Sequence, residues 1–290
     1  MNNYRIFTDA TSDLNEDAMK GLPEAVIIPM PVAVGDTDYL YGTGGNLDVN
    51  DFYKMLEAGQ FASTTAINPD TYTKYFEPCL KDGMDIIYLC FSSGMSSTIH
   101  NAMISADELR DRYPERRITV IDTLCAALGE GFFVLEAARK QAEGLSYDEL
   151  VQWSIDHRQE VCHWFTVDQF EHLLHGGRVS VTEAFAGTIL NIKPLLHVDE
   201  KGMLSVMAKP RGNNKAMRMK LEKMEQGWKP EIGTRVLIGH GDCLERAEEF
   251  KEKVAARFPD ADISIVEIGP VIGAHTGPGM LALLYWGSNR

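Results

Sequence analysis

Short apolar runs in the first half of the chain alternate with segments whose polar pattern has the period of a helix. The apolar runs predict four strands, at residues 4–8, 25–34, 85–91 and 118–121. The third run is continuous, which is typical of a strand buried on both faces of a parallel sheet. The alternation of strands and helices favours an α/β fold with a doubly wound, mostly parallel sheet.

Capping residues mark where the helices of this half begin. Asp48 precedes a helical pattern at residues 48–57. Asn68 followed by Pro69 predicts another helix start, because asparagine caps a helix and proline fits its first turn. A helix that contains glycine is expected from about residue 126 to residue 143.

After a helix at residues 147–157 the elements become more varied. Strands are expected at 161–167, 193–198, 204–208, 235–239, 263–268 and 280–286. The turn Asp-Glu-Lys-Gly at 199–202 predicts a hairpin. Helices are expected from 168, from the capping box at 180–183 to Asn191, and at 244–257. We therefore expect an N-terminal domain at 1–160 and, at 161–290, an α+β domain with a mixed or antiparallel sheet.

The composition limits the partners of the protein. A chain of 290 residues that is 44% hydrophobic is long enough for two packed domains. Its net charge of −14 argues against a nucleic-acid partner and against stable association with anionic membranes. No apolar run approaches the roughly eighteen residues that span a bilayer, and the start MNNYRIFTDA does not resemble a secretory signal. A cytoplasmic protein is expected.

Neither a metal centre nor a familiar catalytic motif is predicted. The five cysteines are scattered and no two have CxxC spacing, and Cys90 and Cys162 are expected to be reduced core residues. His172 and His175 share a helical face, but nothing completes a ligand set, so we expect them at the surface. The GxSxG, GxxxxGK[ST] and HExxH motifs are absent. No cofactor is expected.

Two hydroxyl-rich segments precede predicted helices. Residues 91–98, FSSGMSST, follow the buried strand, and ligands bind at the carboxyl ends of such strands in open α/β sheets. Thr64 and Thr65 precede the helix that starts at Asn68. Hydroxyls beside a helix N-terminus suit a carboxylate or a phosphate. The alternative for both segments is that the side chains only form turns and caps.

Two further segments are candidates for ligand contact. Residues 268–279, IGPVIGAHTGPG, are expected to form a loop between strands, in which glycines allow close backbone approach and His275 offers a donor to an acid. The alternative is a tight connection with a solvated histidine. Residues 209–215 form a basic island around Arg211, which can bind carboxylate or phosphate in bidentate fashion or belong to a solvated loop.

Taken together, these segments resemble the DegV family. The similar motifs are TDATSDL at 8–14, SSGMSST at 92–98, FTVD at 165–168 with GRVS at 177–180, LNIKP at 190–194 and IGPVIGAHTGPG at 268–279. The resemblance runs in order from residue 6 to residue 287. It implies a two-domain α/β protein that is not an enzyme and that binds a long-chain fatty acid, such as palmitate, stearate or oleate, in a buried tunnel between the domains.

The resemblance also implies roles for individual residues. Thr64 and Ser93 would hydrogen-bond the carboxylate, His275 would lie near the head group, and Arg211 would face the head group or a partner. That partner would be a fatty acid kinase, which converts the acid to an acyl phosphate for phospholipid synthesis. The chain has TTAI at 64–67 where the family usually has TSQP, and its basic island lacks one basic residue of the family segment.

Two other functions remain open at this point. The first is a serine-dependent acyl hydrolase with Ser93 as nucleophile and His275 as base, which would need a third group such as Asp9 or Asp122 to orient the histidine. The second is a sugar- or phosphate-binding module, whose cavity would be short and polar. The oligomeric state is not indicated.

Overall fold

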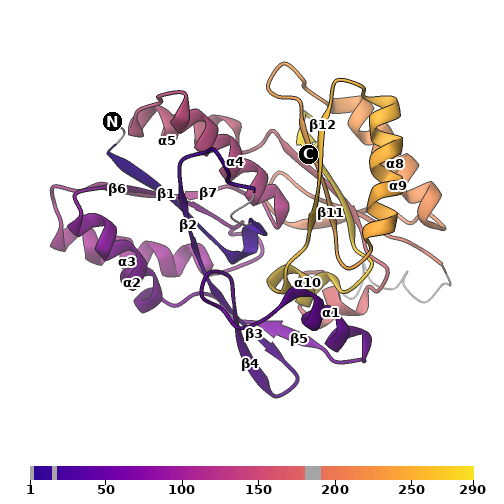
Figure 1. The fold of residues 1–290 in the computed structure, drawn as a ribbon, viewed down its shortest axis with the longest axis horizontal. Helices are drawn as coiled ribbons and strands as arrows, with labels where there is room; N and C mark the ends of the chain where they lie inside the picture. Colours follow the sequence, from indigo (N-terminus) through magenta and orange to yellow (C-terminus); the bar gives the residue numbers. More distant parts are fainter. Residues whose placement is uncertain (1–2, 15–17, 180–190) are drawn as a thin grey trace.

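The computed structural model describes residues 3–14, 18–179 and 191–290, and the strands of these residues form three sheets (Figure 1). A parallel sheet has the order β2-β1-β6-β7, made by Ala25–Ile28, Tyr4–Asp9, Asp85–Cys90 and Ile118–Asp122. A small antiparallel sheet has the order β4-β3-β5, made by Thr37–Tyr41, Met30–Val34 and Ala62–Thr64. A mixed sheet has the order β10-β9-β8-β13-β11-β12, made by Leu204–Ala208, Leu195–Val198, Val161–Thr166, Leu281–Trp286, Arg235–His240 and Asp262–Glu267.

Helices cover both faces of the parallel sheet. One face packs against α2 (Pro69–Lys81) and α3 (Thr98–Arg112), and the other against α4 (Leu128–Ala142) and α5 (Tyr147–His157). The central strand β6 is buried at every position, as a strand between two helical layers must be. The predicted doubly wound parallel sheet is therefore confirmed.

The mixed sheet is covered on one face by α8 (Asn213–Gly227) and α9 (Leu244–Arg257). Its other face is turned toward α4 and the parallel sheet. Four short elements lie near this junction, α1 (Val49–Glu57), α6 (Glu171–His175), α10 (Pro270–Thr276) and the 3₁₀ turn η1 (Ala10–Ser12). Among them α10 is central, because it contacts α1, α6, η1, β3 and β5.

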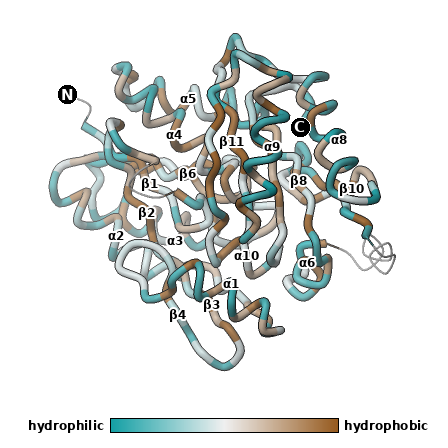
Figure 2. The backbone as a smooth tube through the Cα atoms, turned by 45° about the vertical axis from the view of Figure 1, so that its right-hand side comes forward, coloured by the Kyte–Doolittle hydropathy of each residue, from teal (hydrophilic) through white to brown (hydrophobic). Residues whose placement is uncertain are grey.

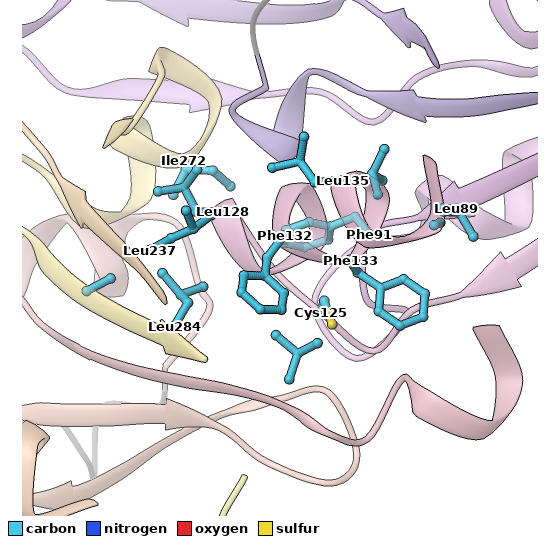
Figure 3. Close-up of a cluster of buried hydrophobic side chains, with 14 of the residues drawn as sticks. Leu89, Phe91, Cys125, Leu128, Phe132, Phe133, Leu135, Leu237, Ile272 and Leu284 are labelled. Atoms are coloured by element: carbon cyan, nitrogen blue, oxygen red, sulfur yellow. The ribbon is translucent and has the colours of Figure 1, made fainter. Parts of the chain in front are cut away.

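One hydrophobic cluster joins the two larger sheets. Figure 3 shows Phe132 and Leu128 of α4 between Leu89 of the parallel sheet and Leu284 of the mixed sheet. Figure 2 shows the hydrophobic segments concentrated in strands such as β1 and β11, with hydrophilic residues along the outer helix α9. The two halves of the chain therefore share a core.

Several sequence predictions are confirmed in detail. The helices expected at 147–157 and 244–257 have these bounds as α5 and α9. The Asn68 side chain accepts a hydrogen bond of 2.8 Å from the Thr71 amide, as an N-cap should. β9 and β10 form the expected hairpin. The domain boundary near residue 160 stays a prediction, but it falls between the last strand of the parallel sheet and the first strand of the mixed sheet.

Other predictions are wrong. The single strand expected at 25–34 is two strands in different sheets, β2 and β3, which separate at Pro29. The expected loop at 268–279 contains the helix α10, which begins with Pro270 at its first position. The strands β4 and β5 and the helix α8 were not predicted. The helix predicted from Ser180 to Asn191 lies largely outside the described residues.

Candidate functional site

Alternate side chains of β8 and β13 line a cavity. His163 is paired with Leu284 and Phe165 with Ala282 across the two strands. Because side chains alternate between the faces of a strand, these four share one face of the mixed sheet. All four line a cavity with a volume of about 90 Å³, and the start of α4 lies on the opposite side.

Most of the cavity wall is apolar. Its apolar side chains come from both halves of the chain and include Met30, Phe91, Met95, Leu128, Leu173, Val198, Leu204, Ile268, Val271, Ile272 and Met280. The polar side chains on the wall are Thr11, Thr64, Ser96, His163, Arg178, His275 and Thr276. The wall thus combines a long apolar surface with a few polar groups, which is typical of a site for an amphipathic small molecule.

Thr64 and His275 meet at one end of the cavity, although they lie 211 positions apart in the chain. Thr64 is the last residue of β5, and its Oγ1 lies 2.9 Å from Nε2 of His275. His275 is held there by α10, whose contacts with β3 and β5 fix its position. The structure therefore brings together two of the four residues predicted to contact a ligand.

The imidazole of His275 is neutral at pH 7. Burial, and then the positive charge of Arg178, lower the pKa of His275 to about 4. Its Nδ1 has no hydrogen-bond partner within the described residues. Gly176 covers this atom so closely that a Cβ at position 176 would lie 2.1 Å from Nδ1. A side chain at position 176 would displace the ring.

Arg178 adds a positive charge to this end of the cavity. The side chain is half-buried and lines the cavity, and its guanidinium donates a hydrogen bond to the Gly176 carbonyl. It forms no ion pair with any described carboxylate, and burial lowers its pKa. Sequence reasoning did not select Arg178, although a cation beside the Gly176-Gly177 break was visible in the GRVS motif.

The serine-rich segment contributes a different residue from the one predicted. Ser93 is exposed and is absent from the described cavity wall. Ser92 is buried and donates a hydrogen bond of 2.7 Å to the Gly202 carbonyl. Ser96 lines the cavity, and its Oγ lies 2.8 Å from Thr98 Oγ1. The spacing of hydroxyls alone could not show which serine turns inward.

The remaining predicted ligand contact, Arg211, and the two histidines of α6 are not on the described cavity wall. Arg211 is exposed, and its backbone pairs with that of Ile192. His175 is exposed as expected, but the surface position predicted for His172 is wrong. His172 is buried, with its ring 5.2 Å from that of Phe61.

A group of buried acids lies behind the cavity wall at Thr11. Thr11 Oγ1 lies 2.6 Å from Glu130 Oε2 and is also hydrogen-bonded to Asp9. A threonine hydroxyl has one hydrogen, so one of the two carboxyl groups must be protonated and donate to Thr11. Burial raises the pKa of Asp9 and, more strongly, that of Glu130. The acids thus share a proton through a residue of the cavity wall.

Comparison with known families matches residues 3–287 to the DegV family, which is described as uncharacterised. The chain belongs to the DegV family. A DegV domain-containing protein of Clostridium perfringens is 36% identical over 290 residues, covering 100% of this chain and 99% of the relative. A DegV domain-containing protein of Lactococcus lactis is 34% identical, covering 97% of this chain and 96% of the relative.

Solved structures of DegV proteins share the fold. A DegV family protein from Thermus thermophilus, described by its fatty acid binding, has a TM-score of 0.86 at 26% identity and covers 99% of this chain and 100% of its own. DegV from Bacillus subtilis, described as a fatty acid binding protein, has a TM-score of 0.83 at 25% identity, with coverage of 99% and 100%. The Streptococcus pneumoniae Fatty Acid Kinase B3 protein, loaded with linoleic acid, has a TM-score of 0.87 at 21% identity, with coverage of 99% and 100%.

The described ranges contain neither a metal cluster nor a membrane-spanning helix. Across 3–14, 18–179 and 191–290, no three or more His, Cys, Asp or Glu side chains are placed to hold a metal ion. None of the helices in these ranges is long and apolar enough to span a membrane. Each of the five cysteines is free, and Cys90 and Cys162 are buried, as predicted.

Proposed function

We propose that this DegV protein is a cytoplasmic carrier that holds one long-chain fatty acid, such as palmitate, stearate or oleate, in the cavity along β8 and β13. The observation that carries the proposal is an apolar cavity with neutral hydrogen-bonding groups at one end and a cation there, Arg178, that forms no ion pair with a carboxylate of the described residues. Fatty acid binding by its Thermus thermophilus and Bacillus subtilis relatives supports it.

Burial of the acyl chain provides most of the binding free energy. At about 0.8 kcal/mol per methylene, a tail of about fourteen methylenes contributes on the order of 11 kcal/mol before the entropy of association is subtracted. Three of the four residues of β8 and β13 on the cavity face, Phe165, Ala282 and Leu284, have apolar side chains that offer no hydrogen bond for a tail to replace. A sugar or a phosphate would leave this apolar surface unused, so a sugar- or phosphate-binding module fits less well.

The carboxylate would lie among Thr64, Ser96, His275 and Arg178. A buried charge is costly unless it is paired and hydrogen-bonded, and Arg178 supplies the opposite charge. A neutral imidazole has a tautomer in which Nδ1 is unprotonated and Nε2 carries the hydrogen. In that tautomer Nε2–H donates to Thr64 Oγ1, which leaves the Thr64 hydroxyl hydrogen free for a carboxylate oxygen.

The geometry fits catalysis by Ser93 poorly. His275 Nε2 lies beside a threonine and not a serine, and Ser93 is exposed. A general base also needs a third group that fixes its tautomer, and no described carboxylate is hydrogen-bonded to His275 Nδ1. We therefore favour binding over hydrolysis.

Solvent extraction of the purified protein followed by mass spectrometry tests the proposal. We expect about one fatty acid per chain from the wild type and clearly less from Thr64→Val or Ser96→Ala, because each removes a hydrogen bond to the head group. Ser93→Ala is the matched control and should retain the wild-type amount. Ester turnover that depends on Ser93, or equal occupancy in all variants, would refute this assignment.

We further propose that Arg211 contacts a fatty acid kinase that phosphorylates the bound acid. Arg211 is exposed and outside the cavity, so its guanidinium is available to a partner. The resemblance to the Streptococcus pneumoniae Fatty Acid Kinase B3 protein supports such a partner.

Arg211→Ala distinguishes contact with a kinase from contact with the head group, through the rate of acyl-phosphate formation and the amount of fatty acid retained. The variant should retain the fatty acid at the wild-type level but give a lower rate of acyl-phosphate formation in the presence of a kinase. An unchanged rate would show that Arg211 does not lie in the contact, and loss of the fatty acid would place it at the head group instead.

A further inference from the structure

The cavity ends at one row of residues across the mixed sheet. Leu204 is paired with Val198, and His163 is paired with Leu284. Continuing the register of β8 and β9, in which Trp164 is paired with His197, places Val198 beside His163. All four residues of this row line the cavity, and His163 is its one titratable member.

The next pair on the same face closes the space. Val161 is paired with Trp286, both are fully buried, and neither is among the described residues that line the cavity. The Trp286 ring packs against the Phe132 ring of α4 at a centroid distance of 5.2 Å. Beyond His163 and Leu284 the face is therefore filled by packed side chains.

This closed end is far from the polar end. Met280, which directly precedes β13 and follows α10, also lines the cavity. The four steps along the chain from Met280 to Leu284 correspond to roughly 13 Å of extended strand. A ligand whose head group lies near Thr64 and His275 would thus direct its tail toward the row of His163.

The His163 ring is held rigidly in this position. Its Nδ1 lies 3.0 Å from the Val161 carbonyl oxygen, so Nδ1–H donates there, and Nε2 is left as the acceptor. Nε2 faces α4, where a Cβ at Gly129 would lie 1.7 Å from it. Burial lowers the pKa of His163 well below its usual value, so the ring is neutral. A fixed, uncharged ring in an otherwise apolar row can limit the length of a tail.

We infer that His163 is a specificity-determining residue that forms the end wall of the acyl site and excludes longer chains. This inference rests on the proposed function. The His163 imidazole and the Leu284 side chain are the last pair on this face before the packed layer of Val161 and Trp286. Ala282 lies on the same face, two residues nearer the polar end. Its small side chain leaves room that a larger one would fill.

The test offers the purified, delipidated protein an equimolar mixture of saturated fatty acids graded from lauric to arachidic acid, and measures the bound acids by mass spectrometry. In His163→Ala the ratio of longer to shorter acids should rise roughly tenfold, as burial of one or two further methylenes would give. Ala282→Leu should shift the ratio toward shorter acids. His197→Ala is the matched control, because His197 is a buried histidine of the neighbouring strand that is not on the described cavity wall.

Each outcome is decisive. A shift in His163→Ala with an unchanged profile in His197→Ala supports the inference. An unchanged profile in His163→Ala, or an equal shift in both histidine variants, overturns it. If His163→Ala does not fold, an Ala282→Leu profile that matches the wild type overturns the inference by itself. A wild-type protein that binds no fatty acid refutes the proposed function instead.

Discussion

At the scale of single residues, Arg178 differs from Thr64 and His275 at the polar end because its side chain carries a full charge. Thr64 offers a hydroxyl, and His275 is neutral because its pKa is lowered to about 4. A carboxylate taken out of water therefore depends on the guanidinium for charge balance. The sequence signal for this residue was present but weak, since one arginine beside two glycines fits many loops.

Substitution of Arg178 should weaken fatty acid binding. Arg178→Met keeps an unbranched side chain but removes the charge, so we expect the dissociation constant for palmitate to rise by roughly tenfold to a hundredfold, the range for a lost hydrogen bond to a charged group. Titration calorimetry measures this change. Arg178→Lys retains the charge but lacks the planar set of donors. Its dissociation constant should therefore lie between those of the wild type and Arg178→Met. Equal affinity in all three proteins would exclude a role for the charge.

At the scale of elements, the best predictions came from helices with strong end signals. Asn68 with Pro69 marked the start of α2, and Asp48 marked the start of α1, where its side chain accepts a hydrogen bond from the Asp51 amide. The failures have a different cause. Residues 25–34 are apolar on both sides of Pro29, so no change of pattern marks the passage from β2 to β3. The glycines around α10 suggested a loop, whereas the tertiary contacts of α10 decide its conformation.

The site itself could be predicted only in part. Thr64 and His275 were identified by residue type and motif, and the structure brings them together. Ser93 and Ser96 have the same hydroxyl and lie in the same segment, so only the direction of each side chain at the end of β6 separates them. His163 lies within an apolar strand pattern, and its position on the cavity face depends on the pairing of β8 with β13.

The proton shared near Thr11 joins three elements, because Asp9 ends β1, Thr11 lies in η1 and Glu130 is in the first turn of α4. In the folded protein the pKa of Glu130 is raised, chiefly by burial and then by the charge of Asp9. The folded state therefore holds a proton that the unfolded chain releases above a pKa of about 4.3. This proton stabilises the fold at low pH, and its contribution is lost as the pH rises toward the folded-state pKa.

Glu130→Gln should flatten this pH dependence. The glutamine amide can donate to Thr11 in place of the carboxyl proton, so the hydrogen bonds remain while the titration is removed. Urea unfolding between about pH 5 and pH 9 should show a smaller fall in the free energy of unfolding than in the wild type. Glu136→Gln is the control on the same helix, because Glu136 is paired with Arg235 at 2.8 Å. Parallel pH profiles for the wild type and Glu130→Gln would contradict a shared proton.

At the scale of the whole molecule, the two larger sheets and the helices between them enclose one cavity with unlike ends. The polar end is built by segments from both halves of the chain, since Thr64 comes from the first and His275 from the second. The apolar part of the cavity lies along β8 and β13. The hairpin of β9 and β10 contributes Val198 and Leu204 to the closed end of the cavity. The cavity wall is complete only when the two halves are packed together, because residues of both halves line it.

A crystal structure of the protein with stearate tests this account most directly. We expect continuous density for an aliphatic chain along the cavity-facing residues of β8 and β13, with the carboxylate within hydrogen-bond distance of Thr64 and Arg178 and the terminal methyl against His163. Density for the acid at another position, or a cavity filled by the surrounding side chains in the presence of saturating stearate, would contradict it.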